Sequence, residues 1–393
     1  SVLQQSIKFN NQRILTSIIP TVAILPENLQ KDAGNIMASP RQVQSRTDLV
    51  KDKSHHLNGR FTNPWPSFTN PPFSHFLSFM LSNISGSPAS KSLKEGRLPK
   101  QVSLDQAAIA NPADVQVTWL GHASLLVQLD GATILCDPVF SKRCSPSQLI
   151  GPSRYTAAPA TVADLPEIDV LVLSHNHYDH MDWNTLKALV ARFPDLPVYA
   201  PLGNEPFLKS VGFKHITVAD WWEEFQVPLS RDSNSGKSLT LACTPAQHMT
   251  NRGLTDRMAT LWSSWSMLGS DGHRFFFSGD TAYSAVYENP TKAHCPVFAQ
   301  IGEVYGPFDL AAIAIGAYGP ETLFGGMHTN PELAVRIHEE IRSKKSIGIH
   351  WGTFILTAEP IDEPPKRLEA EMKSRGHEPA EFSVLAIGGT TTG

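Results

Sequence analysis

Hydrophobic and polar positions follow two different periods along residues 113–393. Short apolar runs rich in Val, Ile, Leu and Phe predict buried strands, at 168–173, 197–200, 239–244, 259–268, 274–278, 310–315, 346–350 and 382–387. Spacings near 3.6 residues predict helices, at 183–193, 204–211, 331–344 and 364–375. The pair Asn330-Pro331 suits the N-cap and first turn of the third helix.

The region opens with strands joined by tight turns. Val115 to Leu120 and Leu125 to Leu129 predict strands, and Asp130-Gly131 predicts a hairpin turn into 132–136. Hairpins followed by alternating strands and helices favour an α+β domain with mixed sheets over a doubly wound parallel sheet. We therefore expect residues 113–393 to form one domain.

The first 112 residues have another pattern. Residues 1–59 are rich in Ser, Asn, Gln and Pro and lack a clear period, which predicts an irregular or disordered tail. Within 60–112, aromatic and apolar residues spaced as in a helix follow Pro71-Pro72, and a polar linker comes after them. The helix predicted over 72–81 either packs on the core or lies in a membrane interface with its apolar face.

The most informative polar cluster follows the predicted strand at 168–173. Residues 175–182, His-Asn-His-Tyr-Asp-His-Met-Asp, contain three imidazoles and two carboxylates. Imidazole nitrogens and carboxylate oxygens are ligands of divalent metals. Residues two apart in an extended chain face the same side, so His175 and His177 can bind one metal. Asp179 and His180 come after the chain turns and can serve a second metal.

Three later strands end in the same kind of residue. His248 follows the strand at 239–244, Asp280 follows the strand at 274–278, and His350 ends the strand at 346–350. Each of these residues alone is more typical of a structural role. Together with the cluster at 175–182, in this order, they predict a metal site.

This series resembles the metallo-β-lactamase superfamily, whose pattern is H-x-H-x-D-H followed by separate His, Asp and His ligands. The resemblance implies a four-layer αβ/βα sandwich that binds two zinc ions, although His/Asp sites also accept iron or manganese. It assigns His175, His177 and His248 to one metal and Asp179, His180 and His350 to the other, with Asp280 and a hydroxide between them. Asp137 would orient a ligand histidine.

Further motifs between residues 60 and 387 resemble one subfamily, the N-acylphosphatidylethanolamine-hydrolysing phospholipases D. They are Asn63 to Pro66, Thr118 to Ala123, Ser145 to Gln148, Ser174 to His180, Asp220 to Glu224, Gly306 to Ile313 and His350 to Phe354. The likeness implies a membrane-associated homodimer. It would hydrolyse N-acylphosphatidylethanolamine to N-acylethanolamine and phosphatidic acid through the hydroxide shared by the metals.

Other residues near these motifs have two interpretations. His328 lies in a glycine-rich loop before a helix start, which is a natural anion site. The resemblance places it beside the reacting phosphate, as a catalytic residue with Asp179 and Asp280; otherwise it is a structural loop histidine. Tyr178 and Gln148 are candidates for lining the site.

Three further histidines are expected to have no part in the chemistry. We expect His122 to be a core histidine and the pair His55-His56 to be incidental. Trp221-Trp222 either touches membrane or substrate or packs in the core.

Composition narrows the function further. The chain is 41% hydrophobic and 18% charged, as in globular proteins with a sizeable core. A net charge of −4 without a long Lys/Arg run disfavours a nucleic-acid partner. The four cysteines have no C-x-x-C spacing, which is typical of buried thiols in an intracellular protein.

The predicted relation to a membrane is peripheral. Apolar runs in the sequence are shorter than the roughly 18 residues of a membrane span, so we expect binding to the cytosolic face. Residues 1–26 contain Lys8 and Arg13 and no acid, and form either an organelle-targeting segment or a disordered tail.

Three alternative functions stay open. The first is a hydrolase of a soluble ester, lactone or other phosphodiester, which would need no apolar platform. The second is a nucleic-acid phosphodiesterase, which the acidic net charge disfavours. The third is a non-catalytic membrane-binding scaffold, which the full set of seven candidate ligands disfavours.

Overall fold

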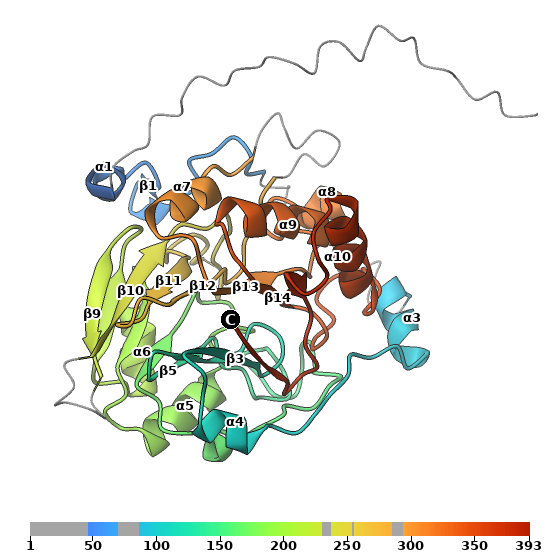
Figure 1. Cartoon of the computed structure of the whole chain (residues 1–393), viewed down its shortest axis with the longest axis horizontal. Coiled ribbons are helices and arrows are strands. Elements are labelled where there is room, and N and C mark those ends of the chain that lie inside the picture. Colours follow the sequence, from blue (N-terminus) through green and yellow to red (C-terminus); the bar gives the residue numbers. More distant parts are fainter. Residues whose placement is uncertain (1–45, 70–85, 230–236, 254, 285–293) are drawn as a thin grey trace, which may run out of the picture. The chain divides into compact units, whose positions relative to one another are not determined.

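Two mixed β-sheets of seven strands each lie face to face (Figure 1). The computed structural model describes residues 46–69, 86–229, 237–253, 255–284 and 294–393, all within the compact unit Val43–Gly393. The first sheet has the order β16 (Thr390–Thr392), β3 (Val115–Trp119), β4 (Leu125–Leu129), β5 (Ala132–Cys136), β6 (Val170–Val172), β7 (Val198–Pro201), β8 (Ile216–Ala219). The second has the order β15 (Phe382–Ser383), β14 (Ser346–Ile349), β13 (Leu310–Ala314), β12 (Arg274–Phe277), β11 (Ser264–Leu268), β10 (Ser238–Thr244), β9 (Glu224–Pro228).

Each sheet has an antiparallel half and a parallel half. In the first sheet, β16 and β3 to β5 pair antiparallel and β5 to β8 pair parallel. In the second, β9 to β12 pair antiparallel and β12 to β15 pair parallel. Parallel strands place their carboxyl ends at a common edge, so the loops that follow them converge there.

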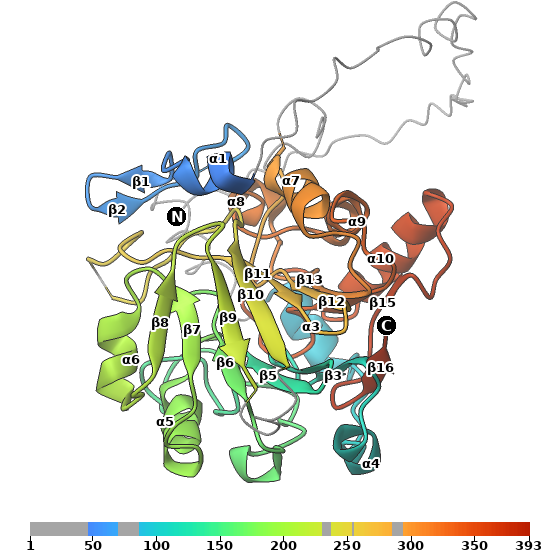
Figure 2. The same cartoon turned by 60° about the vertical axis from the view of Figure 1, so that its left-hand side comes forward.

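Helices cover the outer face of each sheet (Figure 2). The first sheet packs against α4 (Gln106–Ala110), α5 (Trp183–Arg192) and α6 (Glu205–Val211). The second packs against α7 (Val297–Val304), α9 (Pro331–Glu340) and α10 (Glu363–Ser374), beside the short α8 (Glu321–Phe324). The order helix, sheet, sheet, helix is the four-layer α+β sandwich with two mixed sheets that the sequence predicted, and that prediction is confirmed.

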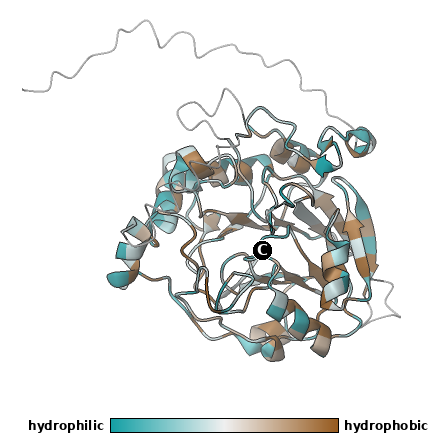
Figure 3. Ribbon diagram, turned by 180° about the vertical axis from the view of Figure 1, so that it is seen from behind, coloured by the Kyte–Doolittle hydropathy of each residue, from teal (hydrophilic) through white to brown (hydrophobic). Residues whose placement is uncertain are grey.

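Central strands of the first sheet are buried on both faces, which explains their continuous apolar sequence. In β4, Leu125 and Val127 belong to the core between the sheets, whereas Leu126 packs under the helices. The same division separates Val172 from Leu171 in β6. Figure 3 shows the hydrophobic colours gathered on the strands and the hydrophilic ones on the outer helices.

The predicted helices in the domain occur within a few residues of their expected bounds. Among the elements that were not predicted are β8 and β9, which are only partly buried, and α7. The linker before the domain contains α3 (Pro88–Lys94), which Ser87 caps by accepting a hydrogen bond from Ser90 N. The helix predicted over 72–81 lies outside the described residues.

The described part of the predicted tail is ordered, which corrects the expectation for residues 46–59. It forms α1 (Arg46–Lys51) and a hairpin of β1 (His56–Leu57) and β2 (Arg60–Phe61). The sequence pattern did not predict these elements, because distant residues stabilise the segment and its own residues have no regular spacing of apolar positions. Residues 1–45 lie outside the described part of the chain.

Asp220 binds this N-terminal segment, so His55 and His56 are not incidental. The Asp220 carboxylate lies 2.6 Å from His55 Nε2 and 2.9 Å from His56 Nε2, and accepts a 2.6 Å hydrogen bond from Lys53 Nζ. The Asp220 carboxylate is already paired with the Lys53 ammonium, so we interpret this cluster as an ion-pair network. The His55 ring also stacks on buried Trp221 at 4.2 Å, which assigns that tryptophan to core packing.

Candidate metal centre

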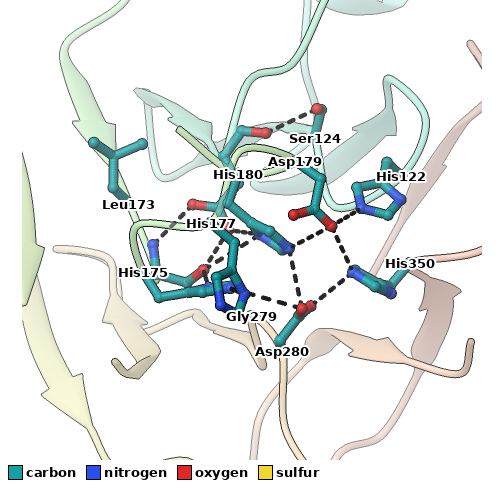
Figure 4. A network of polar contacts seen from close by, with 12 residues as sticks. His122, Ser124, Leu173, His175, His177, Asp179, His180, Gly279, Asp280 and His350 are labelled. Atoms are coloured by element: carbon teal, nitrogen blue, oxygen red, sulfur yellow. Dashed lines mark hydrogen bonds and ion pairs between the residues drawn. The ribbon is translucent and has the colours of Figure 1, made fainter. Parts of the chain in front are cut away.

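Loops at the carboxyl ends of five strands bring the predicted ligands together (Figure 4). The loop after β6 carries the histidine cluster, and the ends of β5, β10, β12 and β14 each add residues. The loops enter from both sheets, so residues more than 100 positions apart in the sequence meet in one buried site. The site residues that they contribute are Asp137, His175, His177, Asp179, His180, His248, Asp280 and His350.

Most of these residues, together with His122, form two groups, and within each group the candidate ligand atoms lie within 4.8 Å of one another. The first group is His175, His177, His248 and Asp280; the second is His122, Asp179, His180 and His350. Overlapping sets join Asp137 to His175 and His180, and His328 to Asp280 and His350. Each group contains at least one carboxylate and imidazoles, which is a donor set typical of zinc and similar divalent metals.

Asp280 lies between the two groups and faces both. Its Oδ2 is 3.7 Å from His175 Nε2 and 3.7 Å from His248 Nε2. Its two oxygens also reach the second group, with Oδ2 3.2 Å from His180 Nε2 and Oδ1 3.0 Å from His350 Nε2. A carboxylate in this position can serve both groups at once.

Hydrogen bonds at Nδ1 direct the other ring nitrogen of three histidines into the site. Asp137 Oδ2 lies 2.6 Å from His180 Nδ1, and the Met327 carbonyl accepts a 2.8 Å hydrogen bond from His248 Nδ1. The Ser174 hydroxyl lies 2.9 Å from His175 Nδ1. Partners of this kind fix the tautomer and ring orientation of metal-binding histidines.

The backbone around the site adopts conformations that few side chains tolerate. Asp137 and His350 have φ angles of +38° and +62°, in the left-handed region. Gly279, with φ of +53°, lies directly before Asp280, and a Cβ there would come within 2.6 Å of Ser174 Cβ. Glycine at this position lets the end of β12 approach the histidine loop closely.

Buried charges strongly shift the pKa values of the site. Burial disfavours ionisation of Asp280, but the neighbouring His180 and His350 outweigh it and hold the Asp280 pKa well below its ordinary value. Burial likewise opposes protonation of His350, yet Asp280 and Asp179 raise its pKa to about 9. Asp280 therefore stays ionised and has positive charge beside it.

The imidazoles of the first group, by contrast, are neutral. Burial lowers the pKa of His177 to about 4 and that of His248 to about 3. A neutral imidazole nitrogen is the form that ligates a metal. The first group therefore presents lone pairs as well as carboxylate charge.

The residues present fit a pair of divalent metal ions. His180 Nε2, His350 Nε2 and Asp280 Oδ1 are buried and lie in the ion-pair contacts described above, but none makes a well-formed hydrogen bond among the described residues. Buried polar atoms normally have a partner, because leaving them unpaired costs about 1–3 kcal/mol each. Their common orientation toward the gap between the two groups is the arrangement that metal coordination would satisfy.

His328 lies at the margin of this cluster. Its Nδ1 is 3.9 Å from Asp280 Oδ2, and its ring centroid is 5.1 Å from that of His248 and 5.3 Å from that of His350. Its side chain is 14% exposed, whereas the side chains of His248 and His350 have no exposure. Burial lowers its pKa to about 3, so the ring is neutral. His328 can thus contact both the candidate ligands and a bound substrate.

Tyr178 and Gln148 line a neighbouring cavity of about 300 Å³. Tyr178 donates a 3.1 Å hydrogen bond to the Arg252 carbonyl. The Arg252 guanidinium lies 4.0 Å from the centre of the Tyr178 ring and 4.3 Å from that of Phe207, so it is held between two aromatic rings. Trp183 completes the aromatic lining.

Sequence reasoning missed His122, which we expected to be an ordinary core histidine. Its Nε2 lies 2.8 Å from Asp179 Oδ2, and its ring is 4.0 Å from that of His350. Only its place directly after Gly121, in a tight connection between two strands, distinguished it in the sequence. The contact with Asp179 spans 57 residues and has no local signal.

Known proteins share the sequence and fold of this chain. The family described as the beta-lactamase superfamily domain matches residues 132–351. N-acyl-phosphatidylethanolamine-hydrolyzing phospholipase D 1 of Caenorhabditis elegans is 37% identical over 81% of this chain and 88% of its own length. A mitochondrial N-acyl-phosphatidylethanolamine-hydrolyzing phospholipase D of Saccharomyces cerevisiae is 30% identical over 71% of this chain and 56% of its own.

Solved structures share the fold at lower identity. A metallo hydrolase of Ignicoccus hospitalis has a TM-score of 0.50 and 22% identity, covering 71% of this chain and 98% of that one. An isothiocyanate hydrolase from Delia radicum gut bacteria has a TM-score of 0.52 and 18% identity, covering 71% and 99%. These two structures support the architecture alone.

Replacing Asp280 by Asn should abolish most of the stabilisation that metal gives the folded chain. An ion that binds only the native state at 100 times its dissociation constant adds about 2.7 kcal/mol of stability. We expect zinc to raise the midpoint of thermal unfolding of the wild-type chain by a few degrees and to leave Asp280→Asn nearly unchanged.

Asp195→Asn is the matched control, because the Asp195 side chain is 73% exposed and pairs only with surface residues. Its response to zinc should equal that of the wild type. An Asp280→Asn chain that zinc stabilises as strongly as the wild type would contradict the assignment of Asp280 to the centre.

Proposed function

Because the chain belongs to the N-acylphosphatidylethanolamine-hydrolysing phospholipase D family of the β-lactamase superfamily, and is a metal-dependent hydrolase, we propose that it hydrolyses N-acylphosphatidylethanolamine to N-acylethanolamine and phosphatidic acid. The observation that carries this proposal is the pair of buried His/Asp groups that share Asp280. Two adjacent cationic sites suit a phosphodiester, whose reacting centre has one oxygen that attacks and another that leaves.

In this proposal His175, His177 and His248 hold one metal, and Asp179, His180 and His350 hold the other, with Asp280 serving both. We favour zinc, since imidazole and carboxylate ligands suit it. When bound, the two ions would supply Lewis-acid chemistry, lowering the pKa of water and offsetting the charge of the phosphate. Asp137 orients His180 for this role through its Nδ1.

His328 is the residue that we assign to the phosphate. It is neutral, partly exposed, and lies between the rings of His248 and His350. A neutral imidazole carries one N–H, which can donate a hydrogen bond to a phosphate oxygen or to the ethanolamide oxygen as it leaves. Its position at the margin of the cluster supports contact with substrate and argues against a purely structural role.

The cavity beside the site supports a substrate with both polar and apolar parts. Tyr178, Trp183 and Phe207 provide aromatic surface, while Gln148 and Arg252 provide hydrogen-bond donors. An N-acylethanolamine group combines an amide with a long hydrocarbon chain, so it needs both kinds of contact. This lining is a reason to prefer the lipid over a small soluble ester.

An exposed apolar loop next to the cavity supports binding at a membrane surface. Leu149 and Ile150 are 86% and 70% exposed, and Trp183 is 40% exposed. Adjacent exposed apolar side chains mark sites that contact lipid or another protein. Among the described helices, none has the length and apolarity that crossing a membrane requires. Peripheral attachment to a cytosolic membrane face and a homodimer, both implied by the resemblance, are part of the proposal.

The proposal that the bond between phosphorus and the ethanolamide oxygen is cleaved is tested by identifying the products. Zinc-loaded protein is incubated with N-acylphosphatidylethanolamine vesicles in water enriched in ¹⁸O, and the lipids are resolved by mass spectrometry. We expect N-acylethanolamine without label and phosphatidic acid carrying one ¹⁸O, because attack at phosphorus adds the water oxygen to the phosphate. Diacylglycerol or free fatty acid as the product would refute the proposal, and Asp280→Asn serves as the inactive control.

The role of the exposed loop is tested by replacing Leu149 and Ile150 with Ser. The double variant should bind vesicles at least tenfold more weakly, since burying one such side chain contributes about 1.5–3 kcal/mol. Its kcat on a short-chain, water-soluble substrate should not change. Vesicle flotation and kinetics on both substrate forms provide the measurements.

Leu98→Ser with Val102→Ser is the matched control, because these residues are 44% and 49% exposed but lie outside the cavity lining. The control should bind vesicles like the wild type. Equal binding by the wild type and the Leu149/Ile150 variant would assign membrane contact to another part of the chain.

A further inference from the structure

His122 connects the two sheets at the candidate metal centre. It lies in the loop between β3 and β4, with its side chain 3% exposed. Its Nε2 is 2.8 Å from Asp179 Oδ2, and Asp179 is a proposed ligand that follows β6. The same Asp179 oxygen is 3.6 Å from His180 Nε2 and 3.5 Å from His350 Nε2. Asp179 Oδ2 therefore lies among three imidazoles, those of His122, His180 and His350.

We propose that His122 is a positioning residue that holds the Asp179 carboxylate toward His180 and His350, and so sets the metal affinity of the second group. The inference rests on the proposed metal centre and is independent of the substrate. It assigns His122 a role that acts through Asp179.

The geometry defines the direction of the hydrogen bond. Two lone pairs cannot approach to 2.8 Å without a proton between them, so Nε2–H donates to Asp179 Oδ2. With its proton directed at the carboxylate, Nε2 has no lone pair to offer a metal. Oδ2 keeps a second lone pair, which can face the ions. His122 thus supports a ligand and is not itself one.

The His122 backbone holds another proposed ligand in place. Its carbonyl oxygen accepts a 2.9 Å hydrogen bond from His350 N and a 2.8 Å bond from Trp119 Nε1. Its own N–H donates to Thr353 Oγ1 at 2.8 Å. One residue thereby fixes Asp179 through its side chain and His350 through its main chain.

His122 also has a left-handed backbone, with φ of +52°. This conformation is uncommon for residues other than glycine, and asparagine tolerates it better than most. The strain is retained where surrounding contacts enforce it, often at functional sites. This backbone conformation allows the effect of the hydrogen bond on metal affinity to be separated from an effect on the stability of the fold.

Two substitutions at this position should differ in opposite ways: one keeps the hydrogen bond that supports metal binding, and the other suits the folded backbone better. In His122→Gln the amide nitrogen falls where Nε2 was, so the hydrogen bond to Asp179 is kept although the backbone suits glutamine less well. In His122→Asn the side chain is one carbon shorter and the donor no longer reaches Asp179, although the backbone suits asparagine better. A purely structural histidine would tolerate Asn at least as well as Gln.

Zinc affinity is measured by competition with a chromophoric chelator on the full chain, and the metal-free chains are melted in parallel. In His122→Asn we expect the dissociation constant of one of the two zinc ions to rise about 10- to 100-fold, the usual effect of losing such a partner. In His122→Gln the dissociation constant should rise by much less than about tenfold, because the hydrogen bond to Asp179 is kept. Metal-free His122→Asn should melt no lower than metal-free His122→Gln.

Unchanged zinc affinity in His122→Asn would overturn the inference, and so would equal losses in both variants. Loss of one whole zinc equivalent in both variants would instead make His122 a direct ligand and would also overturn it. A wild-type chain that binds fewer than two ions refutes the metal centre itself, and this is seen before any variant is compared.

Discussion

Buried negative charge is the constraint on which the rest of this structure depends. Asp280 lies in the interior among imidazoles, and its own ionisation survives burial because His180 and His350 are within 3.2 Å. Placing a carboxylate there without compensation costs several kcal/mol. Divalent cations would add to this compensation and would also coordinate the buried nitrogens that have no hydrogen-bond partner among the described residues. The arrangement of charge therefore suits a metal centre.

The fold supplies this site by bringing strand ends from two sheets to one place. The first sheet contributes the ends of β5 and β6, and the second contributes the ends of β10, β12 and β14. Both faces of the central strands are buried, so their ends are rigid platforms for the loops. Gly279 and the left-handed backbone at His350 then permit the close approach of the loops. Rigid placement suits a site whose ligands require positions accurate to about 0.5 Å.

Local sequence patterns predicted much of this arrangement. Apolar runs predicted the central strands, and ligand-type residues after them predicted the members of both groups except His122. Patterns of this kind cannot reveal a contact between distant residues that are individually unremarkable. His122 meets Asp179 across 57 positions, and His55 meets Asp220 across 165. The strands β8 and β9 were not predicted for another reason. Their residues are partly exposed and do not form an apolar run.

The central claim is that two metal ions share Asp280, and anomalous X-ray scattering at the zinc absorption edge tests it most directly. Crystals of the zinc-loaded chain should give two peaks. One should lie among His175, His177 and His248, the other among Asp179, His180 and His350, with an Asp280 oxygen within bonding distance of each, about 2.0–2.2 Å. A single peak, or peaks that lie away from Asp280, would contradict the account.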